Sequence, residues 1–201
     1  MLRFHATKRR YTLMSILGRI FLVAISLLAG VIISPGQTTG TSIYSDPKGI
    51  YSVAYPRTWY LDARAQGFRV YNFPPSKRVP QIVLPKYGAG ITFPGHRSGS
   101  STIEAWIEEN NRRFPIESRE KIKVSFSAES KPVEVVETVS HWKTGDVEFE
   151  YIDWYFNLNT VPFQANLFYY RGDAYRSELK EVFRQVVTSL QIMKSGKMEG
   201  S

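Results

Sequence analysis

The chain has 201 residues, of which 43% are hydrophobic and 22% charged, as expected for a globular protein with one core of roughly 150 residues. It contains no cysteine, which excludes disulfides, thiolate metal sites, cysteine nucleophiles and a lipoprotein anchor. The formal net charge is +8, but residues 1–36 hold five basic residues and no acidic one. Without these five, the 26 basic residues fall to 21 against 18 acidic ones, so the remainder is only mildly basic and we predict no nucleic-acid partner.

The first 36 residues have the layout of an export signal. Basic residues from Lys8 to Arg10 precede an apolar run from Ile20 to Ile33, and Pro35 ends this run. The run has the length of a signal-peptide core and is shorter than the roughly 20 residues that span a bilayer comfortably. Because the basic flank comes first, the positive-inside rule places residues 37–201 outside the cytoplasm.

The leader supports three interpretations. One is a cleaved signal peptide, which would leave a periplasmic or secreted protein. Another is a single-pass anchor over residues 16–33, in which Arg19 reaches toward the lipid headgroups and the leader keeps the protein at the membrane. The third is a buried core helix. In the first two cases the folded part of the chain is extracytoplasmic.

Beyond the leader, most segments have the alternating pattern of β-strands. Residues 37–43 are small and polar and predict a linker, and the polar end 193–201 predicts a flexible tail. Strands are predicted at 50–55, 68–73, 91–93, 121–130, 133–142, 147–158 and 162–170. Short connections at 143–146 and 159–162 predict that the last four strands pair as an antiparallel meander.

Two segments have the period of an amphipathic helix. The first starts at Ser101 or Thr102, either of which can cap it, and the second spans 173–192. The predicted apolar faces are Ile103, Trp106, Ile107 and Phe114 in the first, and Tyr175, Leu179, Val182, Phe183, Val186, Val187 and Leu190 in the second. This order of strands and helices predicts an α+β domain over residues 44–192, with helices packed on an antiparallel sheet.

One short segment gathers aromatic residues around a proline. The strand 50–55 ends with Tyr55, Pro56 stops it, and Trp59 follows three residues later. These aromatic side chains can form either a binding site or an architectural corner. We favour the corner, in which Trp59 folds back to close the hydrophobic core.

The motifs for phosphate, metal and nucleophilic chemistry are incomplete. The segment 90–97 has the glycine spacing of a P-loop, but His96 and Arg97 stand where Lys and Ser or Thr are required. The three histidines, of which His141 lies on a predicted strand, form no i, i+4 pair. The serines near His96 lack a G-x-S-x-G elbow. We therefore predict no catalytic residue, no metal and no cofactor.

Acidic residues recur at alternate positions near one strand. Asp146, Glu148 and Glu150 project from one face, and two carboxylates on such a face can serve glycoside hydrolysis. Val147 and Phe149 occupy the other face, so we interpret the acids as the solvated side of an antiparallel strand. A hydrolase that uses these carboxylates remains an alternative.

Aromatic residues are abundant in the last two predicted strands. Together with Arg171 and Arg176 they have the composition of a stacking platform for single-stranded nucleic acid, but an exported protein rarely meets such a ligand. We interpret them as core residues and as part of a surface that binds a protein or a small ligand.

Several of these segments occur together in one known layout. They are the corner Tyr55-Pro56-x-x-Trp59, the strand GAGITF from Gly88, the helix at 101–114 and a closing helix that ends in Thr188-Ser189-Leu190. In this order, over residues 44–192, the chain resembles the PsbP-like family, which shares its fold with a Ran-binding nuclear import factor and with small bacterial envelope proteins. The resemblance implies an α/β/α sandwich with a central antiparallel sheet, and a non-enzymatic role.

In photosynthetic members of that family the domain supports the oxygen-evolving complex of photosystem II. The leader of this chain instead has the single apolar core of a bacterial export signal. We therefore predict an exported or membrane-tethered binding or assembly module that supports a membrane or envelope protein complex. The alternatives are the carboxylate hydrolase and a small-ligand carrier with an apolar cavity between the sheet and the helix at 173–192.

Overall fold

The computed structural model describes residues 40–62, 67–75, 84–85, 87–94 and 102–193. The chain divides into two units, Met1–Gln37 and Thr38–Ser201, and every described residue belongs to the second. The predicted leader and most of the predicted tail therefore lie outside the described residues. Among the helices that are described, none is long and apolar enough to cross a membrane.

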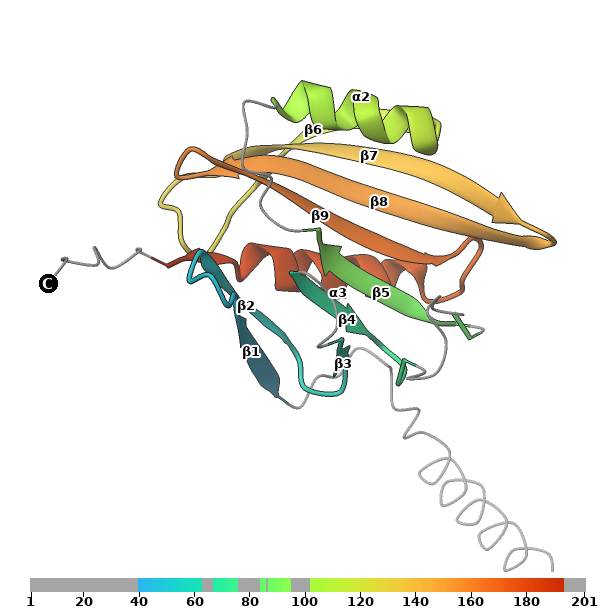
Figure 1. Cartoon of the computed structure of the whole chain (residues 1–201), viewed down its shortest axis with the longest axis horizontal. Helices are drawn as coiled ribbons and strands as arrows, with labels where there is room; N and C mark the ends of the chain where they lie inside the picture. The colour runs from blue at the N-terminus through green and yellow to red at the C-terminus, as the bar shows by residue number, and fades with distance from the viewer. Residues whose placement is uncertain (1–39, 63–66, 76–83, 86, 95–101, 194–201) are drawn as a thin grey trace, which may run out of the picture. The chain divides into compact units, whose positions relative to one another are not determined.

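Seven strands form one antiparallel sheet in the order β3-β4-β5-β9-β8-β7-β6 (Figure 1). Their bounds are β3 Tyr60–Leu61, β4 Phe68–Tyr71, β5 Ala89–Phe93, β6 Ile116–Val124, β7 Val133–Thr144, β8 Val147–Leu158 and β9 Val161–Tyr170. The predicted meander of four long strands is confirmed, and its last two turns have two residues each. Gly145 in one turn, and Asn159 and Thr160 in the other, have positive φ, as tight hairpin turns require.

Three strands form a second, smaller sheet in the order β1-β2-β10, with bounds β1 Thr41–Ser45, β2 Tyr51–Pro56 and β10 Gln191–Ile192. The predicted linker over 37–43 is wrong at 41–43, because β1 pairs along its whole length with β2. The predicted strand over 121–130 is shifted as well. It ends at Val124, and buried Phe126 turns inward to pack against Phe156 at 4.8 Å between ring centroids.

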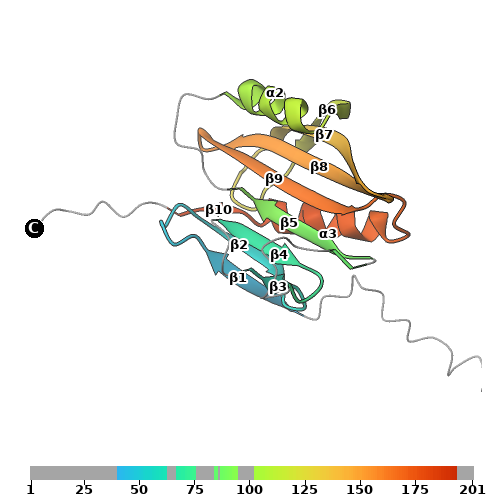
Figure 2. The ribbon, with the colours of Figure 1, turned by 45° about the vertical axis from the view of Figure 1, so that its right-hand side comes forward.

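The helices α2 (Ile103–Arg113) and α3 (Arg176–Thr188) pack on opposite faces of the large sheet (Figures 1 and 2). The predicted cap of α2 is confirmed, since Thr102 Oγ1 accepts a hydrogen bond from the Ala105 N–H at 3.2 Å. Trp106 and Ile107 of α2 share a small core with Val136 and Tyr155. The main core joins α3 to the other face, where Trp154 packs edge-on against Phe183.

Both ends of α3 differ from the predicted helix 173–192. Tyr175 is the N-cap and is 40% exposed, so it does not belong to the buried stripe. At the other end the helix stops at Thr188, because Ser189 bonds to a neighbouring strand. Its hydroxyl accepts from the Ala54 N–H at 2.9 Å, and the carbonyls of Val186, at 2.7 Å, and Ala54, at 3.1 Å, are the acceptors within reach of its one proton. Residues 191–192 then form β10.

The predicted corner after β2 is confirmed. Trp59 is 6% exposed and belongs to the main core, and its backbone N–H donates to the Pro56 carbonyl at 2.9 Å. Within the described residues the domain is a mixed α+β fold, with two helices, a large seven-stranded antiparallel sheet and a small sheet.

Candidate functional site

Two hollows adjoin each other between α3 and the strands β6, β7 and β8. The first, of about 360 Å³, is lined by Ile122, Glu137, Ile152, Trp154, Ser177, Lys180, Glu181, Phe183 and Arg184. The second, of about 490 Å³, is lined by Glu117, Ser118, Val139, His141, Glu150, Arg171, Gly172 and Arg176. They are neighbours because Val139 pairs with Ile152 across the sheet. We call them the tryptophan hollow and the histidine hollow, and together the α3 groove.

Glu150 is the buried carboxylate of the histidine hollow. Its side chain is 5% exposed, and the Arg176 guanidinium lies 2.7 Å from Oε1. Tyr169 donates its hydroxyl to the same oxygen and accepts a hydrogen bond from Arg176 Nε at 3.0 Å. The interpretation of Glu150 as a solvated strand residue is therefore wrong. The α3 side of β8 is covered at this point, which the alternation along one strand does not reveal.

His141 joins two carboxylates across this hollow. Its Nε2 lies 3.2 Å from Glu150 Oε2, and its Nδ1 is in ion-pair contact with Glu117. The pairing of β6 with β7 shifts register between Ile116 and Ser118, so Glu117 is the extra residue of a β-bulge. Bulges re-aim side chains, and this one brings the Glu117 carboxylate to the histidine. His141 lies on β7, as the predicted strand requires, and its side chain is 10% exposed.

Two opposing effects act on the pKa of Glu150. Burial alone would raise it, but hydrogen bonds from Tyr169 and His141, together with the charge of Arg176, hold the pKa below its ordinary value. Burial and the neighbouring Glu150 carboxylate raise the pKa of Tyr169. At neutral pH this site therefore holds a stable carboxylate beside a neutral phenol, with the positive charge of Arg176 at the edge.

Replacing Glu150 by glutamine should destabilise the fold at neutral pH by about 1–2 kcal/mol, because hydrogen bonds to a charged group are lost. A carboxylate whose pKa is lowered on folding stabilises the protein above the pKa of the unfolded chain, and this contribution fades as pH falls. The difference in the free energy of unfolding between Glu150→Gln and the unmodified protein should therefore decrease below about pH 4. Urea unfolding at a series of pH values measures it.

Glu148→Gln is the matched control for that prediction. The Glu148 side chain is 40% exposed and forms an ion pair with Arg171 at the surface. Such pairs contribute about 0–1 kcal/mol, so the control should change stability less. An equal loss in both variants, or a loss for Glu150→Gln that does not depend on pH, would contradict the assigned role of the buried carboxylate.

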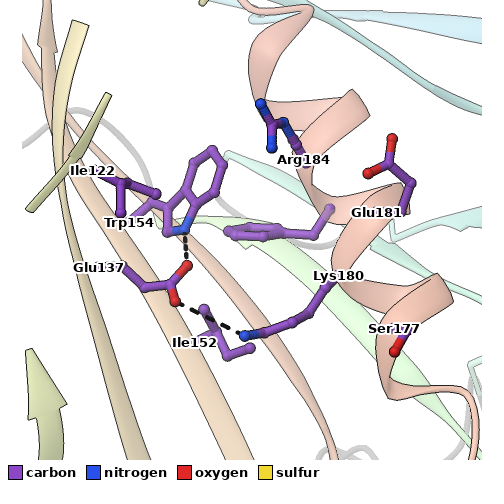
Figure 3. Close-up of a pocket in the computed structure, with 9 residues that line it drawn as sticks. Ile122, Glu137, Ile152, Trp154, Ser177, Lys180, Glu181 and Arg184 are labelled. Carbon is purple, nitrogen blue, oxygen red and sulfur yellow. Dashed lines mark hydrogen bonds and ion pairs between the residues drawn. The ribbon is translucent and has the colours of Figure 1, made fainter. Parts of the chain in front are cut away.

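The tryptophan hollow combines an apolar floor with a carboxylate. Figure 3 shows Trp154 directed at Glu137, and Lys180 reaching from α3 toward the same carboxylate alongside Ile152. The Trp154 indole N–H donates to Glu137 Oε2 at 2.6 Å, whereas Lys180 Nζ lies 3.9 Å from Oε1. The Glu137 side chain is only 13% exposed and that of Lys180 is 39% exposed.

The remaining predicted candidates do not gather at one place. Asp146 lies in the exposed turn between β7 and β8 rather than on the strand, and His96 with its neighbouring serines lies outside the described residues. Gly90 is a buried residue of β5, where an added Cβ would lie 2.3 Å from a ring carbon of Phe168, so its role is packing. In the described part of the chain, no group of three His, Cys, Asp or Glu residues is placed to hold a metal ion.

Glu117, Glu137 and Lys180 are groove residues that the sequence analysis did not single out. A signal exists for one of them. Along β7 the face toward α3 carries Val135, Glu137 and Val139, so one acidic residue interrupts an otherwise apolar face. Polar residues at such positions mark either a surface or a site. The bulge that directs Glu117 has no comparable signature in the sequence.

Comparisons with known proteins add little to this geometry. No model of a known protein family matches the chain, and no curated protein matches it. A protein from Bacteroides thetaiotaomicron VPI-5482, with a crystal structure at 1.50 Å resolution, is similar over 77% of this chain with 15% sequence identity and a TM-score of 0.49. The match covers 49% of that protein, so this chain spans about half of its length.

Proposed function

We propose that this chain is an exported or membrane-tethered, non-enzymatic binding module with a PsbP-like α/β/α sandwich, and that it supports an envelope protein complex through the α3 groove. The export-signal layout of residues 1–36 supports the location. Two helices on opposite faces of an antiparallel sheet support the sandwich. The α3 groove itself is the observation that carries the binding role.

The groove has the composition of a recognition surface. Ile122, Ile152 and Phe183 form an apolar floor, and partly exposed charged side chains of both signs, such as Lys180, Arg171 and Glu117, lie along the groove. Protein interfaces commonly combine an apolar centre with a polar rim. Mixed charges at the rim favour one orientation of a partner over others.

The charge pairing in the histidine hollow favours a binding function over a hydrolytic one. A glycosidase needs one carboxylic acid whose raised pKa lets it donate a proton. Here the pKa of Glu150 is lowered, and Glu148 is a partly exposed side chain ion-paired with Arg171. The small-ligand carrier is the second candidate, because the tryptophan hollow lies between the sheet and α3, where that alternative requires a cavity.

Site-specific photo-crosslinking in the cells that naturally make the protein tests the proposal. A benzophenone amino acid replaces Arg184, an exposed residue at the groove, or Arg112, an exposed arginine of α2 on the opposite face of the sheet. We expect one reproducible envelope protein to be captured from position 184 and not from position 112. Capture of the same protein from both positions, or of none from position 184, would overturn the proposed role of the groove.

A further inference from the structure

The carboxylate of Glu137 is nearly buried and its hydrogen bonding is only half complete. One oxygen accepts the Trp154 indole N–H at 2.6 Å. The other oxygen has Lys180 Nζ at 3.9 Å, which is too long for a hydrogen bond. A buried carboxylate is costly unless it is paired, so this oxygen favours a closer cationic donor.

A second acidic residue adds to the negative charge at this point. Glu120 of β6 lies directly opposite Glu137 of β7 in the register of the sheet. Like charges at directly opposite positions destabilise a strand pair, and a cation between them relieves the repulsion. The nearest positive charge from α3, that of Lys180, is 39% exposed and held only loosely.

Lys180 indicates which kind of cation fits. Its ammonium group points at Glu137 (Figure 3), and its side chain lines the same hollow as Ile152. An alkyl chain that ends in an ammonium group therefore suits both the apolar floor and the carboxylate. The hollow still has a volume of about 360 Å³ with Lys180 in place, which lies within the usual range of roughly 300–1,000 Å³ for ligand pockets.

We infer that the tryptophan hollow receives a lysine side chain of the partner protein, whose ammonium group binds Glu137 and displaces Lys180. The inference rests on the proposed function and names the chemistry by which the α3 groove recognises its partner. The incoming lysine stem lies on Ile152 and Trp154, and its ammonium group donates to the Glu137 oxygen that the indole leaves free. Lys180 competes for the same carboxylate and partly offsets its charge in the empty site.

The test is an NMR titration of the full chain, labelled with ¹⁵N and kept in a mild non-ionic detergent, with Nα-acetyl-lysine amide. The reporter is the indole N–H resonance of Trp154, assigned by its absence from Trp154→Phe. We expect this resonance to shift and saturate with the lysine probe. Nα-acetyl-norleucine amide, which has the same stem without the charge, and the Nε-acetylated lysine probe should leave it unchanged.

Three variants make the test specific. Glu137→Gln, which can still accept the indole hydrogen bond, should abolish the shift. Glu108→Gln removes an equal charge from an exposed residue of α2, on the opposite face of the sheet from the hollow, and should leave the binding constant unchanged. Lys180→Met removes the competing ammonium group while keeping an unbranched side chain, and should tighten probe binding by roughly three- to fivefold.

Three results of the titration would overturn the inference. Equal shifts with the norleucine probe would show an apolar hollow without charge recognition. Unchanged binding in Glu137→Gln would place the ammonium group elsewhere, and no shift even in Lys180→Met would show that the hollow does not admit a lysine. If a partner is captured from position 184 but the lysine probe does not shift the Trp154 indole resonance, only this inference is overturned. If the probe binds but no partner is captured, the proposed function is overturned, whereas the recognition of an alkyl ammonium group by the hollow stands.

Discussion

Replacing Trp59 by alanine is expected to lower the free energy of unfolding by about 3–5 kcal/mol, the range for truncating a large aromatic side chain in a core. Trp59 is 6% exposed and belongs to the same core as α3 and the inner strands. Its backbone turns tightly after Pro56, so the corner aims the indole inward and other side chains have little freedom to fill the space. Urea or thermal unfolding, followed by far-UV circular dichroism, measures the loss.

Trp142→Ala is the matched control for Trp59→Ala. Trp142 lies on β7 and is 45% exposed, although it stacks on Phe149 with ring centroids 5.9 Å apart. Removing this indole leaves no closed cavity, so we expect a clearly smaller loss of stability. If both variants lost the same free energy of unfolding, the loss would reflect only the removal of an indole. The architectural role of the corner would then be wrong.

The strands and helices that dominate the fold follow from local patterns in the sequence. β7, β8 and β9 are long, rich in β-branched and aromatic residues, and separated by two-residue turns, so their antiparallel pairing was accessible from the sequence. The cap at Thr102 followed from its side-chain chemistry. In each case the determining interactions lie within a few residues along the chain.

The elements that the sequence does not predict depend on contacts with residues that are far away in the sequence. β1 has only five residues, in which Thr and Ser flank Ile43 and Tyr44, and it is a strand because β2 lies beside it. β10 has two residues, and the end of α3 just before it is set by a hydroxyl bonded to Ala54, 135 residues away in sequence. Local propensity does not encode contacts of this separation.

The groove was predicted in location but not in its residues. The carrier alternative placed an apolar cavity between the sheet and the last helix, and the tryptophan hollow lies there with charged residues beside its apolar floor. The sequence-based interpretation of Glu150 rests on the alternation of residues along one strand. This alternation distinguishes the two faces of the strand, but it does not indicate which face a helix covers. Its partners Tyr169 and Arg176 come from elements that only the tertiary fold brings together.

Replacing Asp153 by asparagine is expected to stabilise the protein at neutral pH by about 3 kcal/mol. Asp153 is 7% exposed on β8, and burial raises its pKa to about 6, although amide donors from Gln164 and Asn166 oppose the shift. Both amides donate to the same oxygen, at 2.8 Å and 3.2 Å, and asparagine retains an oxygen that can accept them. The variant therefore removes the buried charge and keeps the hydrogen bonds.

The effect of Asp153→Asn should depend on pH in a defined direction. Between the unfolded pKa of 3.8 and the folded pKa of about 6, the folded protein binds a proton that the unfolded chain does not, so Asp153 costs stability as pH rises through this window. The gain from the asparagine should be close to zero near pH 3.5 and complete near pH 7. Urea unfolding at both pH values measures it, and Asp146→Asn, in an exposed turn, controls for the change in net charge. A gain of equal size at both pH values would assign the effect to packing rather than to ionisation, and a loss at pH 7 would show that the carboxylate contributes to the fold.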